Sequence, residues 1–333
     1  MGNIRIVVDA MGGDNAPWAV VKGALRALDD RRLEVVLVGR EKEIVTSLGC
    51  DIPARMRIID APDVINNDEP PAIAIKSKKQ SSLVVGLRLL KDGEADAFVS
   101  AGNTGAVLAG ATVIVGRIKG ILRPALAVLL PTAKGFSFLI DAGANVDAKP
   151  EYLPQFAMMG SIYMENVIGI KKPRVALINI GAEKEKGNAL VKEAFGLLEG
   201  TRVNFTGNIE ARDIAFGDAD VLVCDAFVGN VILKYSEGFA YALLGMVKNE
   251  LTSSTLSKIG AMLSRGAFRN LKKRFDYSEI GGAPFLGLNS LVVKAHGSSD
   301  EKAIKAAILQ CITFVESNIT EKISQEINKG YTE

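Results

Sequence analysis

The stretch Ile4-Arg5-Ile6-Val7-Val8-Asp9-Ala10-Met11-Gly12-Gly13-Asp14-Asn15-Ala16-Pro17 decides our interpretation of the fold. Its β-branched run predicts a strand over residues 4–9, and Pro17 favours the first turn of a helix over residues 17–29. Gly12 and Gly13 fall in the turn between the two. Backbone N–H groups in such a turn and at a helix N-terminus bind anions, most often phosphate. The stretch therefore predicts an α/β fold with an anion-binding loop.

The same alternation of strand and helix continues along the chain. Apolar runs predict strands at 4–9, 34–38, 57–60, 97–100, 126–130, 136–141, 174–180, 203–206, 220–224 and 291–295. Helical patterns cover 17–29, 41–48, 72–91, 104–116, 151–166, 183–198, 228–249 and 299–328. The strands at 126–130 and 136–141 are close enough to form a hairpin, so the sheet is predicted to be mixed. We expect a single α/β domain over residues 1–333, with three α/β/α layers and a mostly parallel sheet.

The composition excludes several classes of protein. A formal net charge of +2 over 333 residues is too small for the positive field of a nucleic-acid-binding protein. One histidine and three distant cysteines fit neither a zinc site nor a disulfide framework. We therefore expect no metal, no cofactor and no nucleic-acid partner. With no leader and no apolar run of about 18 residues, we expect a cytoplasmic protein.

Small and polar residues follow most of the predicted strands. Because ligands bind at the carboxyl ends of strands in an open α/β sheet, we expect these loops to wall one cleft. The candidate substrate- and phosphate-binding residues are Asp9, Gly12, Gly13, Asp14, Ser100, Gly102, Thr104, Gly105, Asp141, Gly143, Asn145, Asn179, Gly181, Gly187, Asp225, Gly229, Gly297 and Ser298. None of the loops has the glycine spacing of a dinucleotide-binding turn or an ATPase phosphate loop.

These blocks resemble the PlsX family, the acyl-ACP:phosphate acyltransferases of bacterial phospholipid synthesis. The similar motifs, in family order, are D-A-M-G-G-D, S-A-G-N-T-G-A, D-A-G-A-N, N-I-G-x-E-x-x-K-G, T-G-N-I-E, D-x-F-x-G-N and A-H-G-S-S. The resemblance implies an architecture like that of isopropylmalate dehydrogenase and phosphotransacetylase, paired as a homodimer. It also implies the reaction of acyl-ACP with inorganic phosphate to give acyl phosphate, the substrate of a downstream membrane glycerol-phosphate acyltransferase.

Four residues are our candidates for catalysis. Attack of phosphate on a thioester needs bound anions and donors aimed at the oxyanion, rather than a strong base. Lys184 is the favoured partner of the phosphate or the oxyanion, and its alternative role is a solvated surface charge. Asn103 and Asn230 are candidate amide donors, although asparagine also caps helices at such positions. His296, the one histidine, is either catalytic or a structural group that caps the following helix.

Other polar residues have a structural alternative as well. Asp9, Asp14 and Asp225 could orient donors, but an acid beside phosphate more often organises its own loop. Cys224 could form an acyl-enzyme, yet it ends an apolar strand with no histidine nearby in sequence, and buried cysteines are usually inert. We therefore expect direct transfer without a covalent intermediate.

Residues 251–275 interrupt the α/β alternation with a basic amphipathic segment that contains no acidic residue. Apolar residues recur at helical spacing (Leu256, Ile259, Leu263, Ala267 and Leu271), with basic residues on the other side (Lys258, Arg265, Arg269 and Lys272). Gly260 and Gly266 favour a break into two short helices. Such a segment binds an anionic membrane surface or packs on the body or on a second subunit. We expect a protruding segment at about 240–277 that makes the dimer and membrane contacts, through Leu256, Ile259, Leu263, Lys258 and Arg265, and places the enzyme peripherally on the inner face of the cell membrane.

Three other functions remain open on sequence grounds. A phosphate acetyltransferase acting on acyl-CoA uses the same chemistry on a shorter donor. A β-decarboxylating dehydrogenase shares the expected architecture but needs an arginine cluster that we do not find. A non-catalytic scaffold for membrane or acyl carrier protein (ACP) would use the basic segment but leave the many strand-end motifs without a role.

Overall fold

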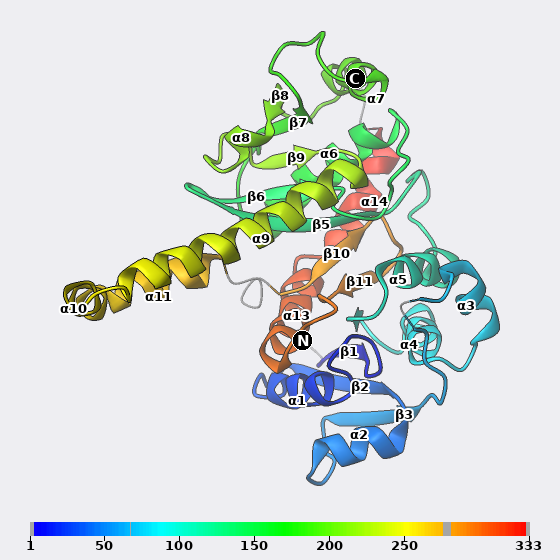
Figure 1. The fold of residues 1–333 in the computed structure, drawn as a ribbon. Helices are drawn as coiled ribbons and strands as arrows, with labels where there is room; N and C mark the ends of the chain where they lie inside the picture. Colours follow the sequence, from blue (N-terminus) through cyan, green and yellow to red (C-terminus); the bar gives the residue numbers. More distant parts are fainter. Residues whose placement is uncertain (1–2, 67, 276–280, 331–333) are drawn as a thin grey trace.

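The computed structural model describes residues 3–66, 68–275 and 281–330 (Figure 1). Among these, eleven strands form one sheet in the order β3-β2-β1-β4-β11-β10-β5-β6-β9-β7-β8. Their bounds are β1 Ile4–Asp9, β2 Leu33–Gly39, β3 Met56–Asp60, β4 Ala97–Ser100, β5 Ala125–Thr132, β6 Gly135–Ile140, β7 Val175–Asn179, β8 Phe205–Glu210, β9 Val221–Val223, β10 Ala283–Leu286 and β11 Leu291–Lys294. The predicted mixed, mostly parallel sheet is confirmed.

Helices cover both faces of this sheet. The α-helices are α1 Trp18–Ala27, α2 Glu41–Leu48, α3 Pro71–Ser77, α4 Ser82–Lys91, α5 Thr104–Gly110, α6 Tyr152–Tyr163, α7 Ala189–Glu199, α8 Ala211–Ile214, α9 Ala226–Leu251, α10 Thr255–Leu263, α11 Arg265–Phe275, α13 Glu301–Glu316 and α14 Ile319–Lys329. Two π-helical turns, η1 Ala111–Val115 and η2 Met164–Ile168, extend α5 and α6. Alternate residues of the strands point to opposite layers, so Ile6 packs with α1 and α13 while Val7 packs with α4. The three-layer α/β/α prediction is confirmed.

The strands reverse direction at the centre of the sheet. β1, β2, β3, β4 and β11 run parallel, β10 is antiparallel to both of its neighbours, and the β5–β6 hairpin is antiparallel. β6, β9, β7 and β8 are parallel to one another and therefore run opposite to the first group. The carboxyl ends of the two groups thus lie at opposite edges of the sheet and approach each other only near its centre.

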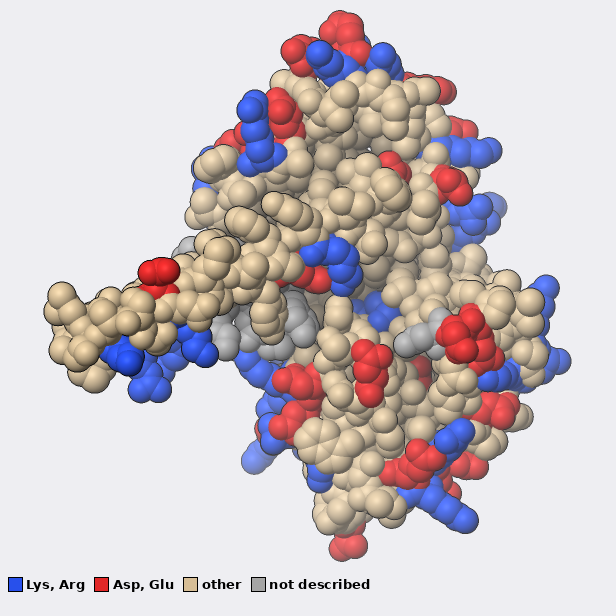
Figure 2. Space-filling view, in the orientation of Figure 1, with Lys and Arg blue, Asp and Glu red and all other residues tan. Residues whose placement is uncertain are grey.

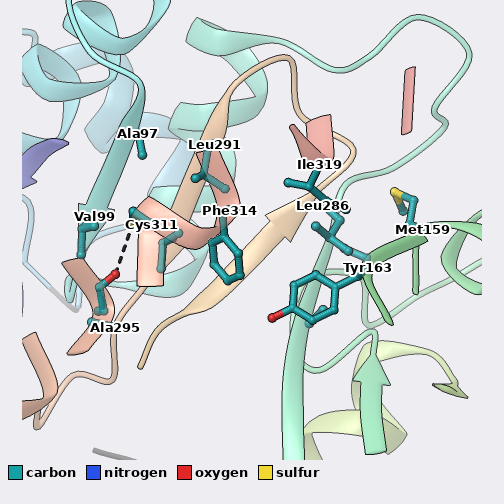
Figure 3. Packing of buried hydrophobic residues seen from close by; sticks show 14 of the residues in the cluster. Ala97, Val99, Met159, Tyr163, Leu286, Leu291, Ala295, Cys311, Phe314 and Ile319 are labelled. Atoms are coloured by element: carbon teal, nitrogen blue, oxygen red, sulfur yellow. Dashed lines mark hydrogen bonds between the residues drawn. The ribbon is translucent and has the colours of Figure 1, made fainter. Parts of the chain in front are cut away.

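Aromatic residues pack where the two halves of the sheet join. Tyr163 of α6 stacks on Phe138 of β6 with ring centroids 4.0 Å apart, and its edge meets Phe314 of α13. Figure 3 shows Tyr163 and Phe314 beside Leu286 of β10. All four side chains are buried. This cluster fixes α6 and α13 against the centre of the sheet.

The structure corrects some of the predicted boundaries. Strand β10 was not predicted, because its sequence Ala-Pro-Phe-Leu follows two glycines and contains a proline. The predicted helix at 72–91 is two helices, since the chain leaves helical geometry at Lys78 and restarts at the Ser81 cap. The helix predicted at 299–328 also breaks, at Asn318, where φ is +51°.

The outer part of α9, with α10 and α11, projects from the body of the molecule (Figure 1). We call this part the projection. The predicted break is confirmed: α10 ends at Leu263 and α11 begins at Arg265. Leu256 and Leu263 are each 80% exposed, and α10 has no buried residue, so the stripe is not packed against the body. Figure 2 shows Lys and Arg gathered along one side of the projection. Residues 276–277, at the end of the predicted segment, lie outside the described residues.

Within residues 3–66, 68–275 and 281–330, every helix is too short or too polar to cross a bilayer.

Candidate functional site

Three strand ends of the first half of the sheet, those of β1, β4 and β11, form one group of loops. The Asp9 carboxylate accepts a hydrogen bond from Ser100 Oγ at 2.7 Å and one from the Met11 backbone N–H at 3.2 Å. Complete burial raises the pKa of Asp9, and these bonds partly offset that effect. A Cβ at Gly12 would lie 2.6 Å from Asp9 Oδ2 and 2.7 Å from the Gly102 nitrogen. Asp9 and Ser100 are therefore organisers of the two glycine loops, which need their glycines for close approach.

The loop that contains Asp14 is bound to the loop that contains His296. The Asp14 backbone N–H donates to the Gly297 carbonyl at 2.8 Å, and the Asn15 side chain donates to the Ser298 carbonyl at 3.2 Å. A Cβ at Gly13 would meet Ala101 and the Gly297 carbonyl. The opening motif thus has a structural role in fixing the end of β11.

Lys294, the last residue of β11, is a buried cation between these loops. Only 8% of it is exposed, and its ammonium donates to the Ala101 carbonyl at 3.1 Å and to the Ala295 carbonyl. Burial lowers the pKa of Lys294 from 10.5 to about 8. The carboxylates of Asp9 and Asp14 oppose that fall in pKa, and the nearby charge of Lys234 adds to it. A lysine so placed changes its protonation within the physiological range.

The ends of β6 and β9 form a second group of loops. The buried Asp141 carboxylate accepts backbone N–H bonds from Leu126, Gly143, Ala144 and Asn145, and a further bond from the Asn145 side chain. Asp225 caps α9 by accepting from the Val228 N–H at 3.0 Å. A Cβ at Gly229 would lie 1.9 Å from the Asp141 carbonyl oxygen, so only glycine lets α9 approach this loop. Asp141, Asn145, Asp225 and Gly229 hold the loop and the helix together.

One cavity of about 420 Å³ receives residues from both groups. Its polar lining comes from both halves of the sheet: Thr104, Gly143, Asn230, Lys234, Glu237, Lys294, His296, Gly297 and Gln310. The remainder is mostly apolar, from β5, β6, β10 and the first turns of α9. Its volume falls in the usual range for small-molecule sites, about 300–1,000 Å³. We take this cavity as the candidate active site.

A lysine and a histidine meet across the cavity. Lys234 Nζ of α9 lies 3.0 Å from His296 Nε2 and 2.9 Å from a Glu237 carboxylate oxygen. An ammonium has no lone pair, so Nε2 accepts from Lys234, while Nδ1 faces the Ser298 hydroxyl at 2.8 Å and accepts from the Ser298 backbone N–H at 3.2 Å. Partial burial and the charge of Lys234 lower the pKa of His296. The lowered pKa keeps the imidazole neutral at pH 7, so the charged groups of this wall are Lys234 and its partner Glu237.

The loop after β7 lies outside this cavity. Lys184 pairs with Glu199 of α7 and lies 5.1 Å from the Phe195 ring centroid, and it does not occur among the described residues that line the cavity. Asn179 donates to the Lys186 carbonyl at 3.0 Å within the same loop, while Gly181 and Gly187 supply its tight turns. β7 is separated from β6 by β9, so its carboxyl end lies farther from the centre of the sheet than those of β6 and β9. This cavity does not bring the loop after β7 together with the other loops, and the catalytic role of Lys184 stays a prediction that its position does not support.

The α5 N-terminus accounts for three further candidates. Asn103 accepts a hydrogen bond from the Ala106 N–H at 3.0 Å and so caps α5. Gly105 lies against Pro71 and Asn103, whereas Thr104 lines the cavity. Of the four predicted catalytic residues, the cavity thus brings together Asn230 and His296.

Sequence reasoning missed Lys294 and Lys234. Lys294 ends an apolar strand, Leu-Val-Val-Lys, and a charge at the end of such a strand is the signal that would have found it. Lys234 lies one helical turn after Asn230, on the same face of α9.

Cys224 is buried, burial raises its pKa well above the ordinary value, and its thiol donates to the Asp141 carbonyl at 3.6 Å. Among the residues that the structure describes, no group of three or more His, Cys, Asp or Glu side chains is placed to hold a metal ion.

The chain is similar to phosphate acyltransferases over nearly its whole length. A phosphate acyltransferase from Clostridium acetobutylicum is 50% identical over 327 residues, which cover 97% of this chain and 99% of that protein. A phosphate acyltransferase from Alkaliphilus oremlandii is also 50% identical over 327 residues, 98% of each chain. Among solved structures, a phosphotransacetylase from Streptococcus pyogenes superposes with a TM-score of 0.62 at 18% identity, covering 95% of this chain and 94% of that one.

The EutD phosphotransacetylase from Staphylococcus aureus superposes with a TM-score of 0.59 at 16% identity, over 95% of this chain and 94% of that one. At these identities the superpositions show the fold alone, and the expected phosphotransacetylase architecture is confirmed. The model of the family described as "Fatty acid synthesis protein" matches residues 4–322. Since this match and the identity to the curated relatives extend over nearly the whole chain, the protein belongs to the fatty acid synthesis protein family, the PlsX family that its motifs resemble.

Proposed function

We propose that this phosphate acyltransferase transfers a long-chain acyl group from acyl-ACP to inorganic phosphate and so supplies acyl phosphate for phosphatidic acid synthesis. The best support for this proposal is that one cavity has both a section lined by lysines and an adjoining section lined by apolar residues. An acyl phosphate consists of a phosphate dianion and a hydrocarbon chain. The dianion is stabilised by positive charge, and the chain is stabilised by apolar surroundings. The curated relatives named phosphate acyltransferases support the same reaction.

In this proposal, phosphate binds between Lys294 and Lys234. Both lysines line the cavity, and among the described residues Glu237 is the one acid that does so. Glu237 is paired with Lys234, which leaves the buried charge of Lys294 for the anion. A bound dianion would raise the pKa of Lys294 from about 8 and keep it charged. Phosphate binding thereby compensates a buried cation.

The reaction needs no further base. An oxygen of the phosphate dianion attacks the thioester carbonyl, the carbonyl becomes an oxyanion, and its collapse expels the thiolate of the carrier, which takes up a proton. Asn230 lies on the wall of the cavity, where its side-chain N–H can face the oxyanion, and His296 holds the Lys234 ammonium on the same wall. The buried Cys224 thiol, with its raised pKa, takes no part.

The projection supports further parts of the proposal. Its exposed apolar side chains include Tyr241 and Met246 of α9 and Leu256, Ile259 and Leu263 of α10. Lys258, Arg265 and Arg269 are exposed beside them. We assign the apolar residues of α9 to a homodimer contact and α10 with its basic neighbours to an anionic membrane surface. Product released there would reach a membrane glycerol-phosphate acyltransferase without crossing water.

A competition between acyl donors tests the proposed function. The purified full-length protein is incubated with inorganic phosphate and equal concentrations of palmitoyl-ACP and acetyl-CoA, and products are identified by mass spectrometry. We expect palmitoyl phosphate to predominate. Acetyl phosphate as the main product would instead make the protein a phosphate acetyltransferase, and no acyl phosphate from either donor would favour a scaffold.

A further inference from the structure

The cavity continues through the sheet between β5 and β10. These strands pair only at Ala125 with Leu286 and at Leu126 with Phe285. Beyond these pairs β5 runs on to Thr132 beside β6, whereas β10 begins at Ala283 and stays beside β11. Pro284 lacks the N–H that a continued ladder requires. The result is an opening between the two strands, lined by Ala127, Val128, Leu129, Gly282, Ala283 and Pro284.

Residues from both faces of the sheet line the same cavity, so the opening crosses the sheet. Val231 and Lys234 belong to α9 on one face, and Tyr163 of α6 and Gln310 of α13 belong to the other. The inner end is closed, because Phe138 and Tyr163 are almost fully buried. Gln310 fixes this end: it is hydrogen-bonded to the Tyr163 hydroxyl and accepts from the Gly282 N–H at 2.8 Å. We call this opening, from Ala283 to Tyr163, the crevice.

We propose that the crevice binds the acyl chain of the donor and that Ala283, Ala127 and Tyr163 limit its length. This inference rests on the proposed function and names the part of the site that selects the substrate. Ala283 pairs with Lys294 in the β10–β11 ladder, so the mouth of the crevice adjoins the cation that we assign to phosphate. A thioester carbonyl held beside Lys294 therefore has its hydrocarbon chain at the mouth.

The lining of the crevice fits a hydrocarbon. From Ala127 and Ala283 to Phe138 and Tyr163, the described lining side chains are uncharged, and Gln310 has its amide engaged. Each methylene group that enters such a crevice raises affinity by about fourfold. Longer chains are therefore preferred until the chain end meets Tyr163. A chain lying instead on the exposed side chains of α9, such as Phe227 and Val231, would meet no such limit.

Substitutions that fill the crevice test the proposal. Ala283→Leu narrows the mouth and Ala127→Val narrows the inner part, while Ala133→Leu, in the exposed β5–β6 turn, is the matched control. With phosphate saturating, we expect Ala127→Val to lower kcat/KM for palmitoyl-ACP by at least tenfold and for butyryl-ACP by less than threefold. Ala283→Leu, at the mouth that every chain enters, should lower kcat/KM for both donors. Equal losses from Ala127→Val for long and short donors, or no loss from either variant, would overturn the proposal, and thermal melting checks that each variant folds.

Crosslinking tests the crevice without any substitution. Palmitoyl-CoA that carries a diazirine at the end of its chain is irradiated with the full-length protein, and labelled peptides are mapped by mass spectrometry. We expect label on Tyr163 or Gln310, and excess palmitoyl-CoA should remove it. Label confined to Phe227, Val231 or the projection would contradict the inference. If no donor yields acyl phosphate, the proposed function fails, yet label at Tyr163 would still support an acyl-binding crevice.

Discussion

The protonation of Lys294 gives the proposed mechanism a measurable pH dependence. At about 1.36 kcal/mol for each pKa unit, the fall from 10.5 to about 8 means that charging Lys294 costs about 3 kcal/mol more in the folded protein than in water. Above pH 8 the free enzyme therefore loses this cation. At pH 9 only about a tenth of the molecules retain it, so kcat/KM for phosphate should fall about tenfold between pH 7 and pH 9.

The assay measures initial rates of acyl phosphate formation at a fixed acyl donor concentration, with phosphate varied at each pH. The alkaline limb should appear in kcat/KM near pH 8 and move to higher pH in kcat, because bound phosphate holds the proton on Lys294. Lys294→Met, which keeps the length of the side chain without its charge, should lower kcat/KM by about a hundredfold and abolish the limb. A limb that persists in Lys294→Met would refute the assignment.

Stability provides an independent readout of the same group. The unfolded state binds the Lys294 proton up to pH 10.5, whereas the folded state releases it near pH 8. Between these values the unfolded chain holds more protons, so the free energy of unfolding should rise with pH, by up to about 3 kcal/mol. Urea denaturation of the wild type and of Lys294→Met at pH 7.5 and 10 measures the difference. An equal pH dependence in both proteins would contradict the shifted pKa.

Four further predictions follow from particular contacts. Lys184→Ala should change kcat/KM by less than threefold, because Lys184 pairs with Glu199 away from the cavity; a hundredfold loss at saturating donor would restore the role that sequence suggested. Cys224→Ala should keep most activity, and a labelled acyl group trapped on the wild type but absent from this variant would refute direct transfer. Asp141→Asn should lower the free energy of unfolding by about 3 kcal/mol, measured by urea denaturation, since an amide NH₂ would face backbone N–H donors. Replacing Leu256, Ile259 and Leu263 by serine should release the protein from anionic vesicles in sedimentation, and added salt should weaken wild-type binding; unchanged co-sedimentation of the variant would place the membrane contact elsewhere.

Local pattern was sufficient to predict most of the sheet and its layers. The strand at Ile4–Asp9 and the hairpin of β5 and β6 were recognisable because apolar runs and turn residues act over a few positions. Strand β10 was not recognisable, because it contains Pro284 and follows two glycines, which disfavour a strand. It forms by pairing with β11 and β5 on either side. Tertiary pairing, rather than propensity, forms this strand.

The site was harder to predict because strand direction is not a local property. The glycine loops after β1, β6 and β7 look alike in sequence. The reversal at β10 and at the β5–β6 hairpin brings the ends of β11 and β6 together at the centre of the sheet, whereas β7 lies beyond β9 and carries the loop of Lys184 farther out. Most of the conspicuous acids and glycines, such as Asp9 and Asp141, proved to organise loops. Lys294 and Lys234 stand in ordinary strand and helix patterns, and only the fold brings them to one cavity.

The most direct test of the account is the fate of labelled phosphate. Palmitoyl-ACP and fully ¹⁸O-labelled inorganic phosphate are incubated with the wild-type protein and with Lys294→Met, and the masses of the products are measured by mass spectrometry. Attack by a phosphate oxygen on the thioester predicts palmitoyl phosphate that retains every labelled oxygen, formed by the wild type and nearly lost in the variant. Unlabelled palmitate without palmitoyl phosphate, or equal product from both proteins, would contradict it.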